Sequence, residues 1–145
     1  VAYAPHADIS GVASAATPEE AVSGASHVSL HLPSTPETAG LVNRELMSSM
    51  TPGTVLVNLA RGDVLDLDAA LWGLGEGILA GVGLDVFPEE PPVHHPLLDH
   101  PRVVLTPHVM GLSTRSARAT FEMAAQGIVD VLTGSPPAAL ANPTV

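Results

Sequence analysis

Apolar residues fall in short runs along the chain, separated by turns and by segments with helical spacing. Residues 55–60, 80–86 and 103–106 form runs without the period-two alternation of a strand that has one face in water. A further strand is predicted at residues 27–32, ended by Pro33. Since helical segments separate these strands, the pattern indicates a parallel sheet covered on both faces, and the predicted fold class is α/β.

Capping residues mark the starts of two short helices near the N-terminus. Thr17 is followed by Pro18 and, three residues after the cap, by Glu20, an arrangement that favours a helix start. Asn43 can accept a hydrogen bond from a helix N-terminus, and the segment after it has helical character through Met50. We therefore expect a short helix after each cap.

Two longer helices are predicted further along the chain. Residues 66–74 carry acids in the first turn, where the helix dipole favours them, and glycines weaken the end of the segment. A segment from about residue 113 to residue 132 is stopped by Gly134 and Pro136. The apolar residues that lie near one face of this last helix are Ala117, Phe121, Ala124, Ile128, Val131 and Leu132.

The composition limits the class of protein and its partners. The chain has 145 residues, 46% of them hydrophobic, and no Cys, which is typical of one soluble domain in a reducing compartment. Lys is absent and the net charge is -10, which disfavours nucleic-acid and anionic-membrane partners. The N-terminus lacks a basic segment followed by an apolar core, so no targeting sequence is predicted and the cytoplasm is the expected location.

Polar side chains follow the C-terminal ends of three predicted strands. Arg61 follows the strand at 55–60, and His108 follows the strand at 103–106. Asp85 and Glu90 stand at the end of the strand between them. Ligands of parallel α/β sheets bind beyond these ends, so we expect the side chains to share one crevice. A guanidinium fork for a carboxylate, with an imidazole held by an acid, is a set suited to carbonyl reduction.

Several motifs follow one another at the same strand ends. They are VSLHLP at 28–33 with TPET at 35–38 and GLVN at 40–43, VNLARG at 57–62, LDVF at 84–87 with Glu90-Pro91, and LTPH at 105–108. In this order, with Arg61 and Glu90 29 positions apart, the chain resembles the NAD-dependent D-isomer-specific 2-hydroxyacid dehydrogenases. That family includes D-3-phosphoglycerate, D-lactate and hydroxypyruvate/glyoxylate-reducing enzymes. The resemblance covers nearly the whole chain and implies a Rossmann-type doubly wound parallel sheet.

The resemblance implies a catalytic set of Arg61, Glu90 and His108. Arg61 would hold the substrate carboxylate and polarise the carbonyl, which a planar fork does better than a Lys point charge. His108 would protonate the carbonyl oxygen in reduction, and Glu90 would hold the imidazole and favour its charged form. Glu89 is adjacent, but the family places the acid directly before a proline, which selects Glu90.

The resemblance also implies an NAD site and a homodimer. No metal site is expected, because no acid or Cys completes a ligand set with the loop histidines His94, His95 and His100. Asp85 would accept a hydrogen bond from the nicotinamide carboxamide and so fix which face of the ring meets the substrate. The other expected cofactor contacts are Leu32, Leu59, Ala60, Arg61, His108 and Gly111. The reaction implied is hydride transfer between NAD(P) and a D-2-hydroxy acid/2-oxo acid pair, with the particular acid left open.

The chain departs from the family pattern because no glycine-rich phosphate loop opens a helix. Residues 75–80 fit G-x-G-x-x-A, but they follow a helix and lead into a strand. They are therefore not expected to form a phosphate-binding loop. We expect the true loop and the first strand upstream of Val1, which makes the chain a C-terminal portion of a dinucleotide-binding domain, without a substrate domain and with a tail from about residue 133. A short strand is also predicted at residues 1–3, and this strand and the strand at Val55 would then carry exposed edges.

A second departure concerns the choice of cofactor. Ala4 stands where NAD-preferring members carry an acid for the adenosine ribose, and only His6 is placed to meet a 2'-phosphate. NAD is the expected cofactor, with NADP left open. Two alternatives to the enzyme also stay open at this point: a corepressor-like protein that binds NAD without turnover, and an inactive truncated remnant.

Overall fold

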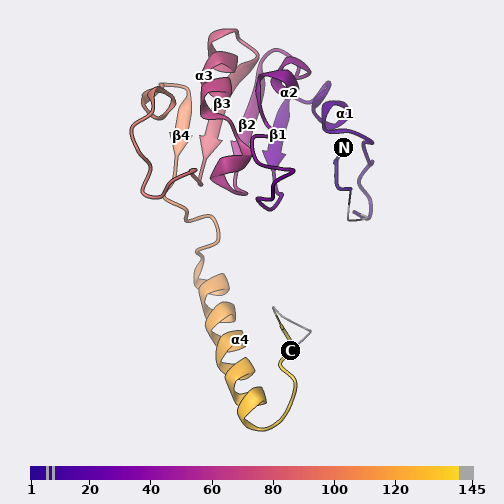
Figure 1. Ribbon diagram of the computed structural model, residues 1–145, viewed down its shortest axis with the longest axis vertical. Coiled ribbons are helices and arrows are strands. Elements are labelled where there is room, and N and C mark those ends of the chain that lie inside the picture. Colours follow the sequence, from indigo (N-terminus) through magenta and orange to yellow (C-terminus); the bar gives the residue numbers. More distant parts are fainter. Residues whose placement is uncertain (6, 8, 141–145) are drawn as a thin grey trace. The chain divides into compact units, whose positions relative to one another are not determined.

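Two compact units make up the chain, Val1–His108 and Val109–Val145. The computed structural model describes residues 1–5, 7 and 9–140. The first unit holds the sheet and the shorter helices, and the described part of the second holds one long helix (Figure 1).

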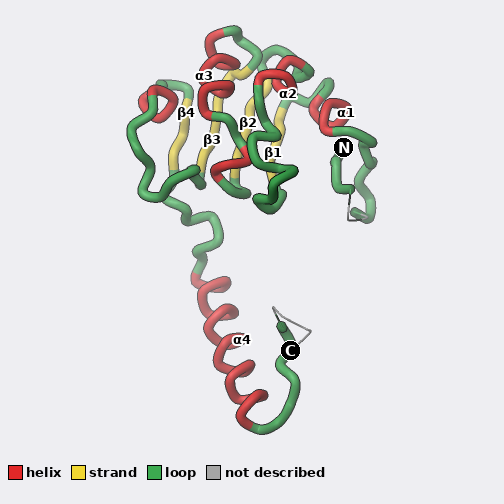
Figure 2. The backbone as a smooth tube through the Cα atoms, in the orientation of Figure 1, coloured by secondary structure: helices red, strands yellow, loops and turns green. Residues whose placement is uncertain are grey.

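The strands of the first unit form one parallel sheet. Within the described residues its order is β1-β2-β3-β4 (Figure 2). The strands are β1 (His27–Leu30), β2 (Thr54–Asn58), β3 (Leu79–Leu84) and β4 (Val103–Leu105), each parallel to its neighbour. Asn58 pairs with Leu30 on one side and with Leu84 on the other, so the carboxyl ends of the strands lie side by side. The prediction of an α/β fold with a parallel sheet is confirmed.

Two helices of the first unit begin after the predicted caps Thr17 and Asn43, and the third begins after Asp66, which the sequence analysis places inside the helix. They are α1 (Pro18–Val22), α2 (Arg44–Ser48) and α3 (Leu67–Gly75). Thr17 Oγ1, Asn43 Oδ1 and Asp66 Oδ1 each accept a hydrogen bond from the amide three residues later, at 3.2, 3.0 and 3.1 Å. These bonds satisfy amides that have no partner inside the helix, which is why the short polar side chains at these positions define the starts.

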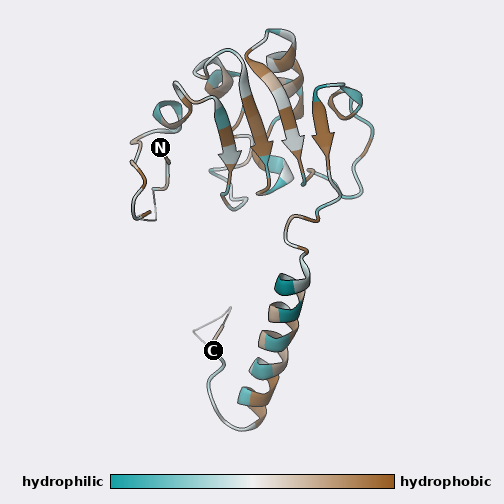
Figure 3. Cartoon of the chain, turned by 180° about the vertical axis from the view of Figure 1, so that it is seen from behind, coloured by the Kyte–Doolittle hydropathy of each residue, from teal (hydrophilic) through white to brown (hydrophobic). Residues whose placement is uncertain are grey.

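One face of the sheet carries both α2 and α3. Seen from behind in Figure 3, the strands have no helix of the first unit over them, within the described residues. Successive right-handed crossovers that move along the sheet in one direction place their helices on the same face, which explains the arrangement. Among the described residues of this unit, the helices cover one face of the sheet, as in an incomplete Rossmann-type sheet. On the open face Val55 and Val57 are half-buried, and Val104 is 69% exposed.

The core lies between this helical layer and the covered face. Its largest fully buried side chains include Met47 of α2, Leu74 of α3 and Leu56 of β2. Leu97, in a short 3-10 helix at Pro96–Asp99, joins the same core. These apolar contacts hold the strand ends in place, and the site residues extend from those ends.

The N-terminus differs from the prediction. Ala2 forms only an isolated parallel bridge with Ser14, so residues 1–3 are not a strand of the sheet. The strand at Val55 carries no exposed edge, because β2 pairs on both sides; among the described strands the edges belong to β1 and β4. The strand predicted at 27–32 also ends two residues earlier, at Leu30.

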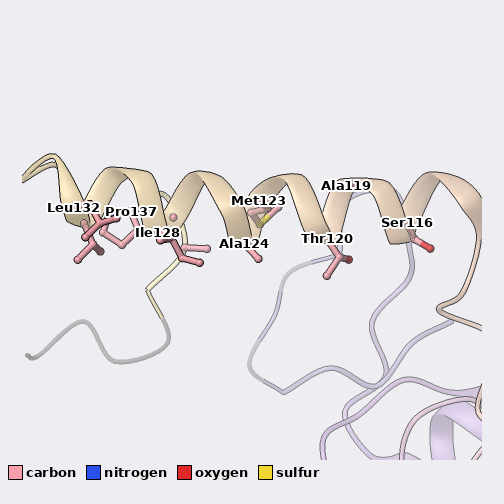
Figure 4. A pocket seen from close by; sticks show the side chains of 11 residues that line it. Ser116, Ala119, Thr120, Met123, Ala124, Ile128, Leu132 and Pro137 are labelled. Atoms are coloured by element: carbon pink, nitrogen blue, oxygen red, sulfur yellow. The ribbon is translucent and has the colours of Figure 1, made fainter.

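The second unit contains α4 (Thr114–Leu132), close to the predicted bounds. Ser113 caps it, and a reciprocal bond between Ser113 and Ser116 completes a capping box. No residue of α4 is buried. The groove along one side of the helix, shown in Figure 4, is lined by Ser116, Ala119, Thr120, Met123, Ala124, Gly127, Ile128, Val131, Leu132, Pro137 and Ala139. None of the helices in the described residues is long and apolar enough to cross a bilayer.

Candidate active site

A buried asparagine shapes the turn that carries Arg61. Asn58 is 1% exposed at the end of β2; its Oδ1 accepts a hydrogen bond from Ala60 N at 3.0 Å, and its Nδ2 donates to Arg61 O at 2.9 Å. The side chain thus spans the turn from the inside and satisfies backbone groups that no strand partner reaches. Beyond the turn, Arg61 Nη1 donates to Ala60 O at 2.7 Å.

Gly62, the next residue, brings this turn into close contact with the loop after β3. Gly62 is buried, and a Cβ there would stand 1.8 Å from the carbonyl carbon of Phe87. Only a residue without a side chain permits such an approach of two backbones. The close contact sets the distance between the Arg61 turn and the loop that bears Glu90.

Glu90 and His108 form a hydrogen-bonded pair. His108 Nδ1 lies 2.8 Å from Glu90 Oε2, and Phe87 N donates to Glu90 Oε1 at 3.0 Å. An ionised carboxylate only accepts hydrogen bonds, so Nδ1 carries the proton and Nε2 is the ring nitrogen left for other chemistry. His108 has a φ of 52°, an uncommon conformation for a residue with a side chain. Glu90, rather than Glu89, contacts the imidazole.

The charge state of Glu90 follows from these contacts. The hydrogen bond from His108 lowers the pKa of Glu90 below its ordinary value of 4.5, and the bond from the Phe87 amide lowers it further. Both donors stabilise the ionised carboxylate, so Glu90 stays charged at neutral pH and keeps the imidazole oriented.

A pocket of about 400 Å³ unites these residues. Arg61, Glu90 and His108 all line it, which places the three residues predicted as a catalytic set around one space. The remaining lining residues are Ser34, Gly62, Asp63, Val86, Phe87 and Pro88. One guanidinium, one imidazole and two carboxylates therefore surround the cavity, an arrangement that can bind a small carboxylate and exchange a proton with it.

Asp85 occupies a buried position at the end of β3. It is 2% exposed, and its Oδ1 accepts a hydrogen bond from Thr106 Oγ1 at 2.5 Å. Leu59 and Ala60 lie in the Asn58 turn, and Leu32 follows β1 at the same edge of the sheet. These four residues are not lining residues of the pocket.

Other predicted positions fall elsewhere. Gly111 belongs to the second unit, where its carbonyl oxygen accepts a hydrogen bond from Ser116 Oγ at 2.5 Å. His6 lies outside the described residues. The G-x-G-x-x-A segment at residues 75–80 joins the end of α3 to β3. It opens no helix, as a phosphate-binding loop would have to. No cluster of metal-binding side chains occurs in the part of the chain that the structure describes.

The sequence analysis missed Asn58, Ser34 and Asp63 as parts of the site. A polar residue at the end of an apolar strand was the available signal for Asn58. Ser34 and Asp63 are 29 positions apart, yet Ser34 Oγ donates a short hydrogen bond to Asp63 Oδ2. Nothing local in either segment indicates that contact.

Comparisons with known proteins all point to one family. Residues 1–110 match the family model for the NAD-binding domain of D-isomer specific 2-hydroxyacid dehydrogenases. A glyoxylate reductase of Thermofilum pendens is 42% identical over 119 residues, which cover 81% of this chain and 35% of that protein. A D-3-phosphoglycerate dehydrogenase of Bacillus subtilis is 44% identical over 114 residues, or 79% of this chain and 21% of that protein.

Solved structures show the same likeness. The holo form of Rhodotorula graminis D-mandelate dehydrogenase superposes with a TM-score of 0.85 at 29% identity, covering 91% of this chain and 39% of that one. A 2-hydroxyacid dehydrogenase from Xanthobacter autotrophicus Py2, solved with NADPH and MES, gives a TM-score of 0.71 at 34% identity, covering 83% and 49%. The chain thus spans well under two thirds of the length of these relatives.

Proposed function

The chain belongs to the D-isomer-specific 2-hydroxyacid dehydrogenase family, and from this premise we propose that it carries the proton-transfer site of an NAD(P)-dependent oxidoreductase. The reaction is the interconversion of a small 2-oxo acid and its D-2-hydroxy acid. The observation that carries the proposal is the Glu90–His108 pair at 2.8 Å in one pocket with Arg61.

His108 is the proton donor in the direction of reduction. Its Nδ1 proton is committed to Glu90, so Nε2 delivers a proton to the carbonyl oxygen and takes it back in oxidation. Glu90 fixes the ring and stabilises the imidazolium, because its own lowered pKa keeps it ionised.

Arg61 binds the carboxylate of the same substrate. A guanidinium presents paired N–H donors to two carboxylate oxygens, and this places the neighbouring carbonyl at a defined distance from the imidazole. Such positioning holds the carbonyl and the imidazole in a reactive orientation. Orientation of this kind supplies a large part of the rate enhancement of enzymes.

The residues present fit the nicotinamide end of a dinucleotide. A buried carboxylate such as Asp85, at the carboxyl end of a parallel strand, is the acceptor that a carboxamide requires. Leu32, Leu59 and Ala60 would border it with backbone groups. When bound, NAD(P) supplies the hydride in reduction and accepts it in oxidation. NAD is the proposed cofactor, and NADP stays the alternative, since Ala4 provides no carboxylate for the ribose.

An absorbance assay tests the function. The full-length natural protein is mixed with NADH or NADPH and with a panel of 2-oxo acids that includes glyoxylate, hydroxypyruvate and pyruvate, and the decrease of nicotinamide absorbance is followed. We expect oxidation of NADH with at least one acid of the panel. Cofactor binding without turnover across the panel would refute the enzyme and revive the corepressor-like reading, for which the relatives described above give no support.

Location and assembly belong to the same proposal. We propose a cytoplasmic homodimer that binds neither nucleic acid nor membranes, supported by the net charge of -10 and the family resemblance. That the chain is a C-terminal portion of a larger dinucleotide-binding domain also stays a prediction. Light scattering of the natural protein, with its intact mass, decides both oligomeric state and length.

A further inference from the structure

Asp63 forms hydrogen bonds with both ends of the loop at residues 34–40, which follows β1. Its carboxylate accepts a hydrogen bond from Ser34 Oγ at the start of the loop, and its backbone oxygen accepts one from Gly40 N at 2.8 Å at the end. Within the loop Thr38 Oγ1 donates to Pro33 O at 2.7 Å. The loop is therefore a compact unit, and Asp63, in the turn after β2, contacts both of its ends.

The same residue is a potential competitor for the substrate. Asp63 is two positions from Arg61, and both line the pocket. A carboxylate near a guanidinium attracts it, and the pair would occupy the fork that a substrate carboxylate needs. Among the described residues, however, Arg61 forms no ion pair, and its guanidinium donates to Ala60 O instead.

We propose that Ser34 restrains Asp63 and thereby keeps Arg61 available for the substrate carboxylate. Ser34 acts through Asp63, so it is a positioning residue. The inference rests on the proposed function in so far as the ligand of Arg61 is a 2-oxo acid. It assigns to Ser34 and Asp63, 29 positions apart, a joint effect on substrate affinity.

The size of the effect follows from the exposure of the groups. Arg61 and Asp63 are both exposed, and exposed ion pairs have modest equilibrium constants. Removing the Ser34 hydroxyl should weaken binding of a carboxylate at Arg61 by about two- to fivefold. The change should appear in KM more than in kcat, because the competing pair forms when the substrate is absent.

A double-mutant cycle tests the proposal in the full-length protein. Ser34→Ala should raise the inhibition constant of oxamate, an unreactive 2-oxo acid analogue, and the KM of the best 2-oxo acid by about two- to fivefold. Ser34→Ala/Asp63→Asn should restore both to wild-type values or better. Asp63→Asn alone completes the cycle, and Ser34→Ala should cause no further loss in that background. A merely structural role of Ser34 predicts the same loss in both backgrounds, so equal losses overturn the proposal, as does a Ser34→Ala variant with unchanged constants.

Two matched variants control for a lost hydroxyl and a lost charge. Ser48→Ala removes the Oγ hydrogen bond to Arg44 O in α2, and Glu76→Gln removes an exposed carboxylate after α3. Neither residue lines the pocket, so both variants should keep wild-type constants. A shift equal to that of Ser34→Ala in Ser48→Ala would count against the specific restraint.

Crystal structures of the wild type and Ser34→Ala give a readout that needs no turnover. In Ser34→Ala the Asp63 carboxylate should move to within about 4 Å of the Arg61 guanidinium, the range of an ion pair. An unmoved Asp63, or an Asp63–Arg61 pair already present in the wild type, overturns the inference and leaves the proposed function intact. A wild type without turnover refutes the function, whereas this structural comparison still decides the restraint.

Discussion

Gly62 and Phe87 bring two backbone segments into direct contact, since a Cβ on Gly62 would stand 1.8 Å from the carbonyl carbon of Phe87. Gly62→Ala should therefore push the loop after β3 away and destabilise the fold by about 2 kcal/mol or more. Gly75→Ala is the matched control, because a Cβ at Gly75 meets nothing within 4 Å. Urea unfolding followed by circular dichroism measures both; equal stability of the two variants would show that the loops separate without cost.

Removal of the imidazole should abolish most of the turnover. His108→Ala eliminates the proton donor, and we expect kcat to fall by about a hundredfold or more while the dissociation constant of NADH changes little. Steady-state kinetics and fluorescence titration of NADH provide the two quantities. Survival of turnover would remove His108 from the catalytic set.

Adjacent glutamates offer an internal comparison. Glu90→Gln removes the charge that faces His108 Nδ1, and we expect a decrease in kcat of about tenfold or more. Glu89→Gln removes the same charge from a residue outside the pocket lining and should leave kcat within about a factor of two. The opposite order of effects would mean that the acid was assigned to the wrong glutamate.

The guanidinium fork should not be replaceable by an ammonium. Arg61→Lys keeps the charge but loses the paired donors, so the KM of the 2-oxo acid should rise by about tenfold. Arg44→Lys serves as the control, since Arg44 lies over the Trp72 ring at 5.4 Å and does not line the pocket. Initial rates at varied substrate concentration distinguish the variants, and an unchanged KM in Arg61→Lys would contradict the bidentate clamp.

Titration of Glu90 should depend on its partner. The His108 hydrogen bond is the largest cause of the lowered pKa of Glu90, so His108→Ala should raise that pKa toward 4.5. A folded-state pKa below the unfolded value contributes stability above the unfolded pKa, and this contribution is lost as pH falls through the folded pKa. His108→Ala should therefore show a weaker loss of stability in that acid range. Carboxyl carbon shifts of Glu90 across the pH series check the direction, and an unchanged midpoint would contradict the assigned cause.

Much of the fold could be predicted because its signals are local. The buried runs at β2 and β3, and the caps Thr17 and Asn43, each act within a few residues, so a single segment contains the information. The order of Arg61, Glu90 and His108 at strand ends also follows from the chain alone, since parallel strands align their carboxyl ends. The family resemblance rests on those same segments.

Tertiary structure decided what depends on residues distant in the chain. The coverage of one sheet face, the double pairing of β2 and the isolated bridge at Ala2 depend on which strands become neighbours. The contact between Gly62 and Phe87, and the hydrogen bond from Ser34 to Asp63, join segments that share no local pattern. The chain by itself therefore determined the elements and the chemical groups at their ends, because periodicity and capping are short-range effects. Packing of the loops determined which of those groups meet, because distances across the site depend on the whole sheet.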